Sequence, residues 1–228
     1  MLNTKDTKRA IIFANGHLPD LEPARHLIRP NDFLIAADGG TRHALELGLL
    51  PSIVIGDLDS LTPDDRQRLE GSGVEIHQYP PDKNETDLEL ALRTALEAGY
   101  RSILVLAALG GRLDHTLGNL VLLTVPSLAE VDVRLDDGLE EAFFVRTQAD
   151  IQGCPGDTVS LIPWGGLSEG VTTEGLRWPL RGETLHPDKT RGVSNEMLAE
   201  IATISLKSGL LLVIHRPTDN GCRLRNHN

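Results

Sequence analysis

The sequence predicts two domains: an α/β domain with a mainly parallel, Rossmann-like sheet, followed by an all-β sandwich or roll. Roughly the first 125 residues alternate short apolar runs with helical patterns, which is typical of a parallel sheet covered on both faces. After about residue 128 helical periodicity nearly disappears, and short strands separated by glycine-containing turns are typical of an all-β domain. We therefore expect the domains to be residues 1–137 and 138–228.

Continuous apolar runs mark the strands of the first domain, except the fourth, Val74-Glu75-Ile76-His77, in which only two residues are apolar. The expected strands end at turn residues, such as Asn15-Gly16 after the first and Pro80-Pro81 after the fourth. An apolar run of this length bounded by turn residues is typical of a strand buried inside a sheet. We expect these strands at residues 10–14, 33–37, 53–55, 74–77 and 102–108.

Capping residues mark the helices between these strands. Thr62 is a suitable N-cap, and Pro63 suits the first helical position. Thr86 and Glu89 form a T-x-x-E capping box, and Gly99 ends that helix. Two further helices are expected, one over residues 41–47 and one that carries Leu113, Leu117, Leu120 and Val121 on an apolar face.

The β-rich stretch that follows is recognised by short apolar or alternating segments. Turns at Gly165-Gly166 and Ser208-Gly209 separate some of them. We expect strands at residues 131–135, 142–145, 158–162, 202–206 and 210–215.

Composition and charge exclude several functional classes. The formal net charge of −11 argues against non-specific nucleic-acid binding. The longest apolar runs, 103–109 and 210–214, are too short to span a membrane. Residues 1–6 contain no hydrophobic signal region, so we expect a cytoplasmic protein. Cys154 and Cys222 are too few for a disulfide framework and form no CxxC pair typical of zinc sites.

Two carboxylates, Asp57 and Asp59, directly follow the apolar run 53–55. At strand spacing they would point to the same side, where like charges repel each other unless a cation neutralises them. Mg²⁺ is usually held by one or two carboxylates together with substrate phosphates. The alternative is an ordinary turn, because Asp and Ser are common turn residues. Taken alone, the pair leaves both interpretations open.

Polar clusters also follow the neighbouring strands. In parallel sheets, ligands bind beyond the carboxyl ends of the strands. The clusters that fall at this edge are Asp38, Asp57 with Asp59, Asp82 with Lys83, and Arg112 with Asp114. Randomly placed surface charges would not fall repeatedly at one edge of the sheet, so these four clusters favour a functional site there.

Phosphates would have to be held without the common glycine-rich loops, because neither GxxxxGK[ST] nor GxGxxG occurs in the chain. Two glycine pairs, Gly39-Gly40 and Gly110-Gly111, stand between a strand and a helix start. They would let backbone N–H groups approach an anion, although a glycine pair often only makes a turn.

Other residues near this edge also allow two interpretations. Asp87 lies in the first turn of a helix, where it either offsets the helix dipole or acts as a third metal carboxylate. Lys83 and Arg112 could neutralise phosphate charge, although Lys83 could equally be a solvated surface residue. His115 is either a general base or part of a helix start.

Four motifs occur in order in the first domain: Asp38-Gly39-Gly40, Gly56-Asp57-Leu58-Asp59-Ser60, Asp82-Lys83-Asn84-Glu85-Thr86-Asp87 and Gly110-Gly111-Arg112-Leu113-Asp114-His115. The second domain adds Gly175-Leu176-Arg177-Trp178-Pro179-Leu180 and Gly192-Val193-Ser194-Asn195-Glu196. Together these motifs resemble the thiamine pyrophosphokinase (thiamine diphosphokinase) family, and the resemblance spans nearly the whole chain.

The resemblance implies an enzyme that transfers the β,γ-diphosphate of ATP to the thiamine hydroxyl and releases AMP. It implies Mg²⁺ as cofactor, ATP as co-substrate, and a homodimer that holds thiamine in a cleft between subunits. The first domain would bind ATP and Mg²⁺ and carry catalysis. The second would bind thiamine and dimerise.

The resemblance also assigns roles to individual residues. By similarity, the metal ligands are Asp57, Asp59 and Asp87, and the catalytic residues are Asp59, Asp87, Arg112 and Asp114. The nucleotide would be bound by Asp38, Gly39, Gly40, Lys83, Thr86, Gly110, Gly111, Arg112 and His115. Ser194, Asn195 and Trp178 would border thiamine. Some family members carry Gln at the position aligned with Lys83.

The chemistry fits these residues, because diphosphoryl transfer needs positioning and charge neutralisation more than covalent catalysis. Either Asp114 or Asp59 could accept the proton of the alcohol, and the sequence leaves this choice open. Two rival functions remain: a pyrophosphokinase acting on a hydroxymethylpterin, and a nucleotide-binding sensor that performs no chemistry.

Overall fold

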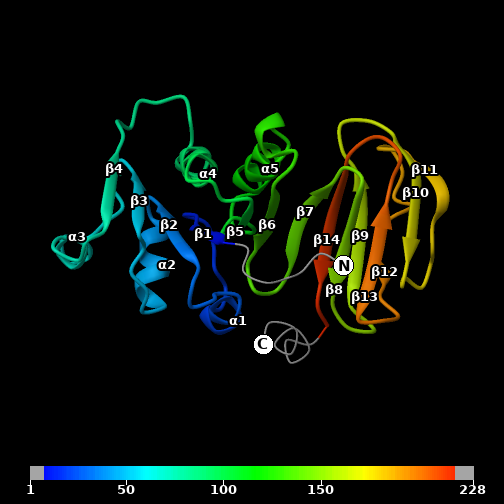
Figure 1. Ribbon diagram of the computed structural model, residues 1–228, viewed down its shortest axis with the longest axis horizontal. Helices are drawn as coiled ribbons and strands as arrows, with labels where there is room; N and C mark the ends of the chain where they lie inside the picture. The colour runs from blue at the N-terminus through cyan, green and yellow to red at the C-terminus, as the bar shows by residue number, and fades with distance from the viewer. Residues whose placement is uncertain (1–7, 219–228) are drawn as a thin grey trace. The chain divides into compact units, whose positions relative to one another are not determined.

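The computed structural model describes residues 8–218 of the chain, which forms two compact units, Met1–Asp137 and Gly138–Asn228 (Figure 1). The first unit is α/β and the second is all-β, which confirms the predicted order of fold classes. Residues 1–6, Cys222 and the tail beyond residue 218 lie outside the described residues. No helix between residues 8 and 218 is long and apolar enough to cross a membrane.

The first unit contains a parallel sheet with the strand order β6-β5-β1-β2-β3-β4. Its strands are β1 (Arg9–Phe13), β2 (Phe33–Ala37), β3 (Ile53–Gly56), β4 (Glu75–Gln78), β5 (Ser102–Leu106) and β6 (Asp132–Asp136). The strand order reverses between β1 and β5, and such a switch point is where parallel sheets bind ligands.

Both faces of the central strands β1 and β2 are covered, as predicted, whereas the edge strand β4 is largely exposed. Ile11 and Phe13 of β1 share one core cluster with side chains of β2, β3, β5 and α2. The alternate residues Ile12 and Ile35 are also fully buried. Since alternate residues of a strand point to opposite faces, neither face of β1 or β2 is open to solvent.

Helices connect the strands of the first unit. They are α1 (Leu21–His26), α2 (Gly40–Glu46), α3 (Pro63–Leu69), α4 (Asp87–Glu97), α5 (Leu113–Leu122) and the 3₁₀ helix η1 (Pro126–Leu128). The hydroxyls of Thr62 and Thr86 accept hydrogen bonds from the backbone N–H groups of Asp65 and Glu89, which confirms both predicted N-caps. Helix α1 was not predicted, because it is short and contains an internal proline.

The predicted interpretation of α5 is only partly correct. Of the four residues predicted for its apolar face, Leu120 is buried, whereas Leu113 is 72% exposed and Leu117 and Val121 are also exposed. Periodicity identifies an apolar face of a helix but does not say which partner covers it. Along α5 the core of the first unit reaches only the part near Leu120.

The second unit consists of two antiparallel four-stranded arrangements with the orders β12-β9-β14-β7 and β11-β10-β13-β8. The strands are β7 (Glu141–Val145), β8 (Gln148–Gln152), β9 (Thr158–Pro163), β10 (Ser168–Glu174), β11 (Arg181–Leu185), β12 (Asn195–Glu196), β13 (Ile201–Ser205) and β14 (Leu211–Arg216). Side chains from both arrangements form one core cluster, as in a β-sandwich.

Several β-strands differ from the prediction. The segment expected at 131–135 pairs in parallel with β5, so it belongs to the α/β unit and not to the β-rich stretch that follows. Strands β8, β10, β11 and β12 were not predicted. These segments are rich in polar residues, and β10 also carries register irregularities in its pairing with β11. Their pairing is decided by neighbouring strands more than by local pattern.

Candidate active site

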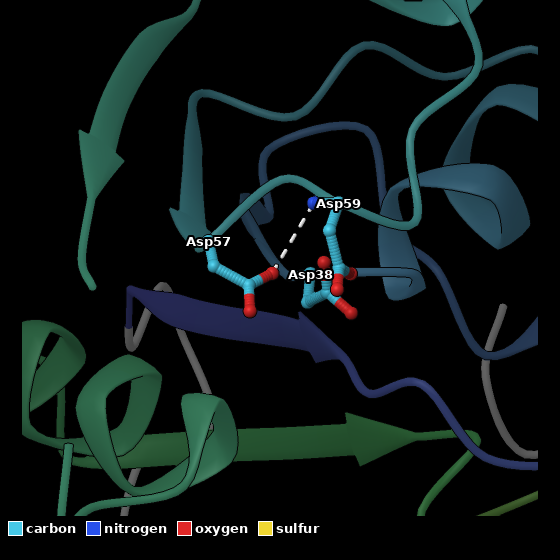
Figure 2. Close-up of side chains that lie close together, drawn as sticks. All are labelled: Asp38, Asp57 and Asp59. Atoms are coloured by element: carbon cyan, nitrogen blue, oxygen red, sulfur yellow. Dashed lines mark hydrogen bonds between the residues drawn. The ribbon is translucent and has the colours of Figure 1, made fainter. Parts of the chain in front are cut away.

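Three carboxylates meet at the carboxyl ends of β2 and β3. One carboxylate oxygen from each of Asp38, Asp57 and Asp59 lies within 4.8 Å of the other two (Figure 2). Strands β2 and β3 are neighbours, with Ala37 opposite Ile55, so the loops that follow them are brought side by side. We call Asp38, Asp57 and Asp59 the acid cluster. Asp38, expected at the nucleotide, thus joins the two predicted metal carboxylates.

The two carboxylates of the sequence motif approach each other for a different reason from the one predicted. Strand β3 ends at Gly56, so strand alternation does not apply to Asp57 and Asp59. Leu58 between them has a left-handed backbone with φ 66°, and the Asp59 N–H donates to Asp57 Oδ1 at 3.2 Å. The segment is therefore a turn, and this turn also places the two carboxylates together.

The acid cluster is electrostatically strained as it stands. The charge of Asp57, followed by partial desolvation and the charge of Asp38, raises the pKa of Asp59 above its ordinary value. Like charges at this separation disfavour full ionisation unless a cation neutralises them. An all-oxygen donor set of carboxylates is the type of site that suits a hard cation such as Mg²⁺.

A pocket of about 500 Å³ opens beside the acid cluster, within the first unit. It lies at the carboxyl ends of β1, β2 and β5 and at the N-termini of α4 and α5. Its lining includes seven residues predicted for the site: Asp38, Thr86, Asp87, Gly110, Gly111, Arg112 and His115. Of the polar clusters predicted at this sheet edge, Asp38 and Arg112 line the pocket. The other members, Asp57, Asp59, Asp82, Lys83 and Asp114, are not among its lining residues.

The two glycine pairs serve different structural purposes. A Cβ on Gly39 would overlap the side-chain amide of Asn15, and one on Gly40 would overlap the carbonyl oxygen of Phe13. These two glycines allow α2 to pack closely against β1. Gly110 and Gly111 both have φ 72°, a left-handed conformation that favours glycine, and both line the pocket.

Asp87 and Lys83 form an ion pair at the start of α4. Lys83 Nζ lies 3.0 Å from Asp87 Oδ1, and that oxygen is buried without a hydrogen bond of acceptable geometry. Asp87 lines the pocket and lies outside the three-acid group, although its charge contributes to the raised pKa of Asp59. Asp87 thus presents a buried carboxylate oxygen with spare acceptor capacity.

Arg112 and Asp114 form a two-point contact at the start of α5. Arg112 Nη2 and Nε donate to the Asp114 carboxylate at 2.6 and 3.2 Å. Both side chains are largely exposed, and the hydrogen bond from Arg112 lowers the pKa of Asp114. A fork-shaped pairing of this kind is also how a guanidinium grips phosphate oxygens, so a phosphate could compete for Arg112.

The three residues expected at thiamine lie together in the second unit. Asn195 is buried, and its side chain accepts from the Trp178 N–H at 3.0 Å and donates to the Trp178 carbonyl at 2.7 Å. Ser194 has φ 58°, and its N–H donates to Ser160 Oγ. Trp178 is 50% exposed, and the guanidinium carbon of Arg177 lies 5.3 Å from the centroid of its ring.

Several pocket residues were missed from the sequence. Asn15, His17 and Asn119 line the pocket, and Asn15 and Ser60 donate hydrogen bonds to Asp38. The available signal was position: Asn15 and His17 directly follow the first predicted strand, at the same edge as the acid cluster.

Comparison with known proteins identifies the family. The model of the thiamin pyrophosphokinase catalytic domain matches residues 24–135, and the model of the thiamin pyrophosphokinase vitamin B1 binding domain matches residues 145–211. The chain belongs to the thiamine pyrophosphokinase family. The catalytic-domain match falls within the first unit, which holds the acid cluster, and the vitamin B1 match falls within the second.

Individual thiamine pyrophosphokinases are similar over most of their length. The protein of Bacillus subtilis is 34% identical over 187 residues, covering 81% of this chain and 87% of that protein. Its crystal structure matches with a TM-score of 0.83 at 29% identity, over 93% of this chain and 100% of that chain. The structure from Geobacillus thermodenitrificans gives 0.81 at 26% identity, over 94% and 99%. This chain is therefore a member of an enzyme family.

Proposed function

We propose that this protein transfers the diphosphoryl group of ATP to the hydroxyl of thiamine, giving thiamine diphosphate and AMP. The observation that carries the proposal is the acid cluster beside a pocket of about 500 Å³, within the unit matched by the catalytic-domain model. The reaction requires a site that collects negative charge from a triphosphate, and this site combines carboxylates for a cation with a guanidinium for phosphate.

The residues that would hold Mg²⁺ are Asp57, Asp59 and Asp38, with Asp87 from the start of α4 as a further candidate ligand. The fit rests on the close carboxylate oxygens of the acid cluster and on the buried Asp87 oxygen that lacks a hydrogen bond. A cation held by these residues would supply positive charge to offset the negative charge of the triphosphate. Lys83, which pairs with Asp87, limits the excess negative charge at this point.

The nucleotide phosphates occupy the pocket between the starts of α4 and α5. Gly110 and Gly111 leave backbone open to an anion, and Thr86 and His115 also line this space. Arg112 leaves Asp114 and forms its two-point contact with phosphate oxygens, where it offsets charge that grows on the transferred group. Gly39 and Gly40 support this site by the close packing of α2 rather than by contact.

The alcohol proton has two candidate acceptors. Asp114 has a lowered pKa while Arg112 holds it, so it becomes a better base when Arg112 moves to phosphate. Asp59 has a raised pKa in the protein without cation, and cation binding would remove that advantage. We therefore favour Asp114 as the acceptor.

Thiamine contacts the second unit near Ser194 and Trp178. Asn195 fixes the backbone of Trp178 through two hydrogen bonds, so it orients the exposed indole.

The active species is a homodimer. An exposed apolar stripe on α5, formed by Leu113, Leu117 and Val121, supports association, because monomers seldom leave such a surface uncovered. Because ATP is the co-substrate, we place the enzyme in the cytoplasm.

One assay tests this function directly. Purified protein is incubated with ATP and thiamine, with and without Mg²⁺, and AMP and thiamine diphosphate are quantified. We expect both products in equal amounts and only with Mg²⁺. Product formation with a hydroxymethylpterin but not with thiamine would establish the rival pyrophosphokinase. Nucleotide binding without AMP release for either acceptor would establish the sensor.

A further inference from the structure

Asp38 is the buried member of the acid cluster and the most constrained. It is 8% exposed and adopts a left-handed backbone with φ 46°. Its N–H donates to the Ile55 carbonyl at 2.7 Å, and its carbonyl accepts from the N–H and hydroxyl of Thr41 at 3.0 and 2.8 Å. A left-handed backbone is uncommon for a non-glycine residue, and here these backbone hydrogen bonds hold it in place.

Each carboxylate oxygen of Asp38 accepts one hydrogen bond from a neutral side chain. Ser60 Oγ donates to Oδ1 at 2.7 Å, and Asn15 Nδ2 donates to Oδ2 at 3.1 Å. The donors come from the loops after β3 and β1, which flank β2 on either side in the sheet. The carboxylate is therefore held between two neighbouring loops, and each oxygen keeps acceptor capacity for a cation.

Two glycines make room for this arrangement. A Cβ on Gly39 would overlap the amide group of Asn15. A Cβ on Gly56 would lie 3.0 Å from the Asp38 Cβ. The glycines of the motifs Asp38-Gly39 and Gly56-Asp57 therefore have a role of their own. Gly39 leaves room for the Asn15 amide, and Gly56 leaves room for the Asp38 side chain that accepts its hydrogen bond.

We propose that Ser60 and Asn15 are positioning residues that hold the Asp38 carboxylate in the acid cluster, so that the cation site is preassembled. Without these donors, repulsion from Asp57 and Asp59 would turn the Asp38 carboxylate away from its neighbours. Ser60 has the larger effect, because its loop also carries Asp57 and Asp59. The inference rests on the proposed Mg²⁺ site.

The test measures cation affinity directly, with Mn²⁺ as the probe. Free Mn²⁺ is titrated against the full chain by electron paramagnetic resonance, without nucleotide or thiamine. Removing a group that orients a metal ligand typically weakens affinity by about 10–100-fold. We expect Ser60→Ala to raise the Mn²⁺ Kd at least about tenfold, and Ser60→Thr, which keeps the hydroxyl, to restore it to within about threefold.

The matched control is Ser72→Ala. The Ser72 hydroxyl also donates to a neighbouring acceptor, the Leu69 carbonyl, but makes no contact with the acid cluster. Its Mn²⁺ Kd should equal that of the unaltered protein. Thermal unfolding shows whether Ser60→Ala is folded. Asn15→Ala is an independent variant on another loop, and it should also weaken Mn²⁺ binding, so the test does not depend on Ser60→Ala being folded.

Steady-state kinetics supplies a second readout. The positioning role predicts that Ser60→Ala needs more Mg²⁺ for half-maximal rate while the KM for thiamine is unchanged. Unaltered Mn²⁺ affinity in both Ser60→Ala and Asn15→Ala, with affinity lost in Asp57→Asn, would overturn the positioning role and leave the proposed cation site intact. Unaltered affinity in Asp57→Asn as well would overturn both.

Discussion

At the residue scale, the acid cluster shows how one short motif can form both a turn and a candidate cation site. The left-handed Leu58 closes the turn, and the same turn presents Asp57 and Asp59 to Asp38. The turn and metal interpretations of the motif are therefore compatible rather than exclusive. Backbone residues in sparsely populated conformations persist at functional sites because the surrounding structure enforces them.

Asp57→Asn and Asp59→Asn should each reduce turnover on the order of 100-fold, because a lost metal ligand removes transition-state charge stabilisation. The free energy of unfolding should hold or rise, since each change is nearly isosteric and relieves repulsion within the cluster. AMP release and urea unfolding measure the two effects. Near-normal activity of both variants at low Mg²⁺ would contradict the metal site.

Arg112→Lys should lose substantial activity although the charge is retained. Arg112 now forms a two-point contact with Asp114, and this geometry is not available to an ammonium group. The measurement is kcat together with the KM for ATP. If lysine supports full kcat and an unchanged KM, Arg112 acts only as a surface charge.

At the element scale, two helix caps allow the contribution of a cap to folding stability to be measured separately from a contribution to ATP binding. Thr62 and Thr86 cap α3 and α4 through the same type of hydrogen bond, but only Thr86 lines the pocket. The two caps form a natural matched pair, because the local physics of the helix start is the same and the surroundings differ.

Thr62→Ala and Thr86→Ala should therefore each lower the free energy of unfolding by about 1 kcal/mol, which is the usual worth of an N-cap. Only Thr86→Ala should raise the KM for ATP. Urea denaturation and steady-state kinetics measure the two quantities. An equal rise of KM in both variants would indicate that the effect comes from helix fraying rather than from phosphate contact.

A buried network joins the strands of the second unit. His215 of β14 lies between Glu141 of β7, 3.0 Å away, and Asp157 before β9, 3.1 Å away. Asp157 also accepts hydrogen bonds from the N–H groups of Thr218 and Cys154. Burial raises the pKa of Asp157, but these hydrogen bonds outweigh burial, so the pKa is lowered below 3.8.

The sign of this shift determines an acid-stability prediction. Because the folded pKa of Asp157 is lowered, its contribution is complete above the unfolded value of 3.8 and is lost as pH falls through the folded pKa. Asp157→Asn should be less stable than the unaltered protein at pH 7 by about 1–3 kcal/mol. The difference should shrink below pH 3.8 in denaturant titrations. A difference that does not vary with pH would assign the loss to packing alone.

At the scale of the whole molecule, the two units carry separate parts of the proposed reaction. The acid cluster and the phosphate pocket lie in the first unit, and the residues proposed for thiamine lie in the second. A change at the thiamine residues should therefore affect one substrate and spare the other.

Ser194→Trp should raise the KM for thiamine far more than that for ATP, because the bulky side chain would fill space beside Asn195, whereas the residues that line the phosphate pocket belong to the first unit. Initial rates with each substrate varied in turn provide the comparison.

Sedimentation should show a two-chain particle at micromolar concentration. A strictly monomeric, fully active enzyme would contradict the shared-cleft arrangement implied by the family.

Local chemistry by itself determined much of this protein. Apolar runs ending in turn residues predicted most strands of the first unit, and the capping residues Thr62 and Thr86 predicted the starts of two helices. Both signals are local, because a cap or a buried strand depends mainly on nearby residues. The placement of polar clusters at strand ends also located the site, since parallel strands share one carboxyl edge.

Tertiary structure alone decided which side chains meet. The grouping of Asp38 with Asp57 and Asp59, and the donors Asn15 and Ser60, depend on the order β1-β2-β3 in the sheet. The polar strands β10 and β11 likewise form through pairing with neighbours, and the exposure of Leu113 depends on how far the core extends along α5. Such contacts join residues distant in sequence, and no local pattern encodes them.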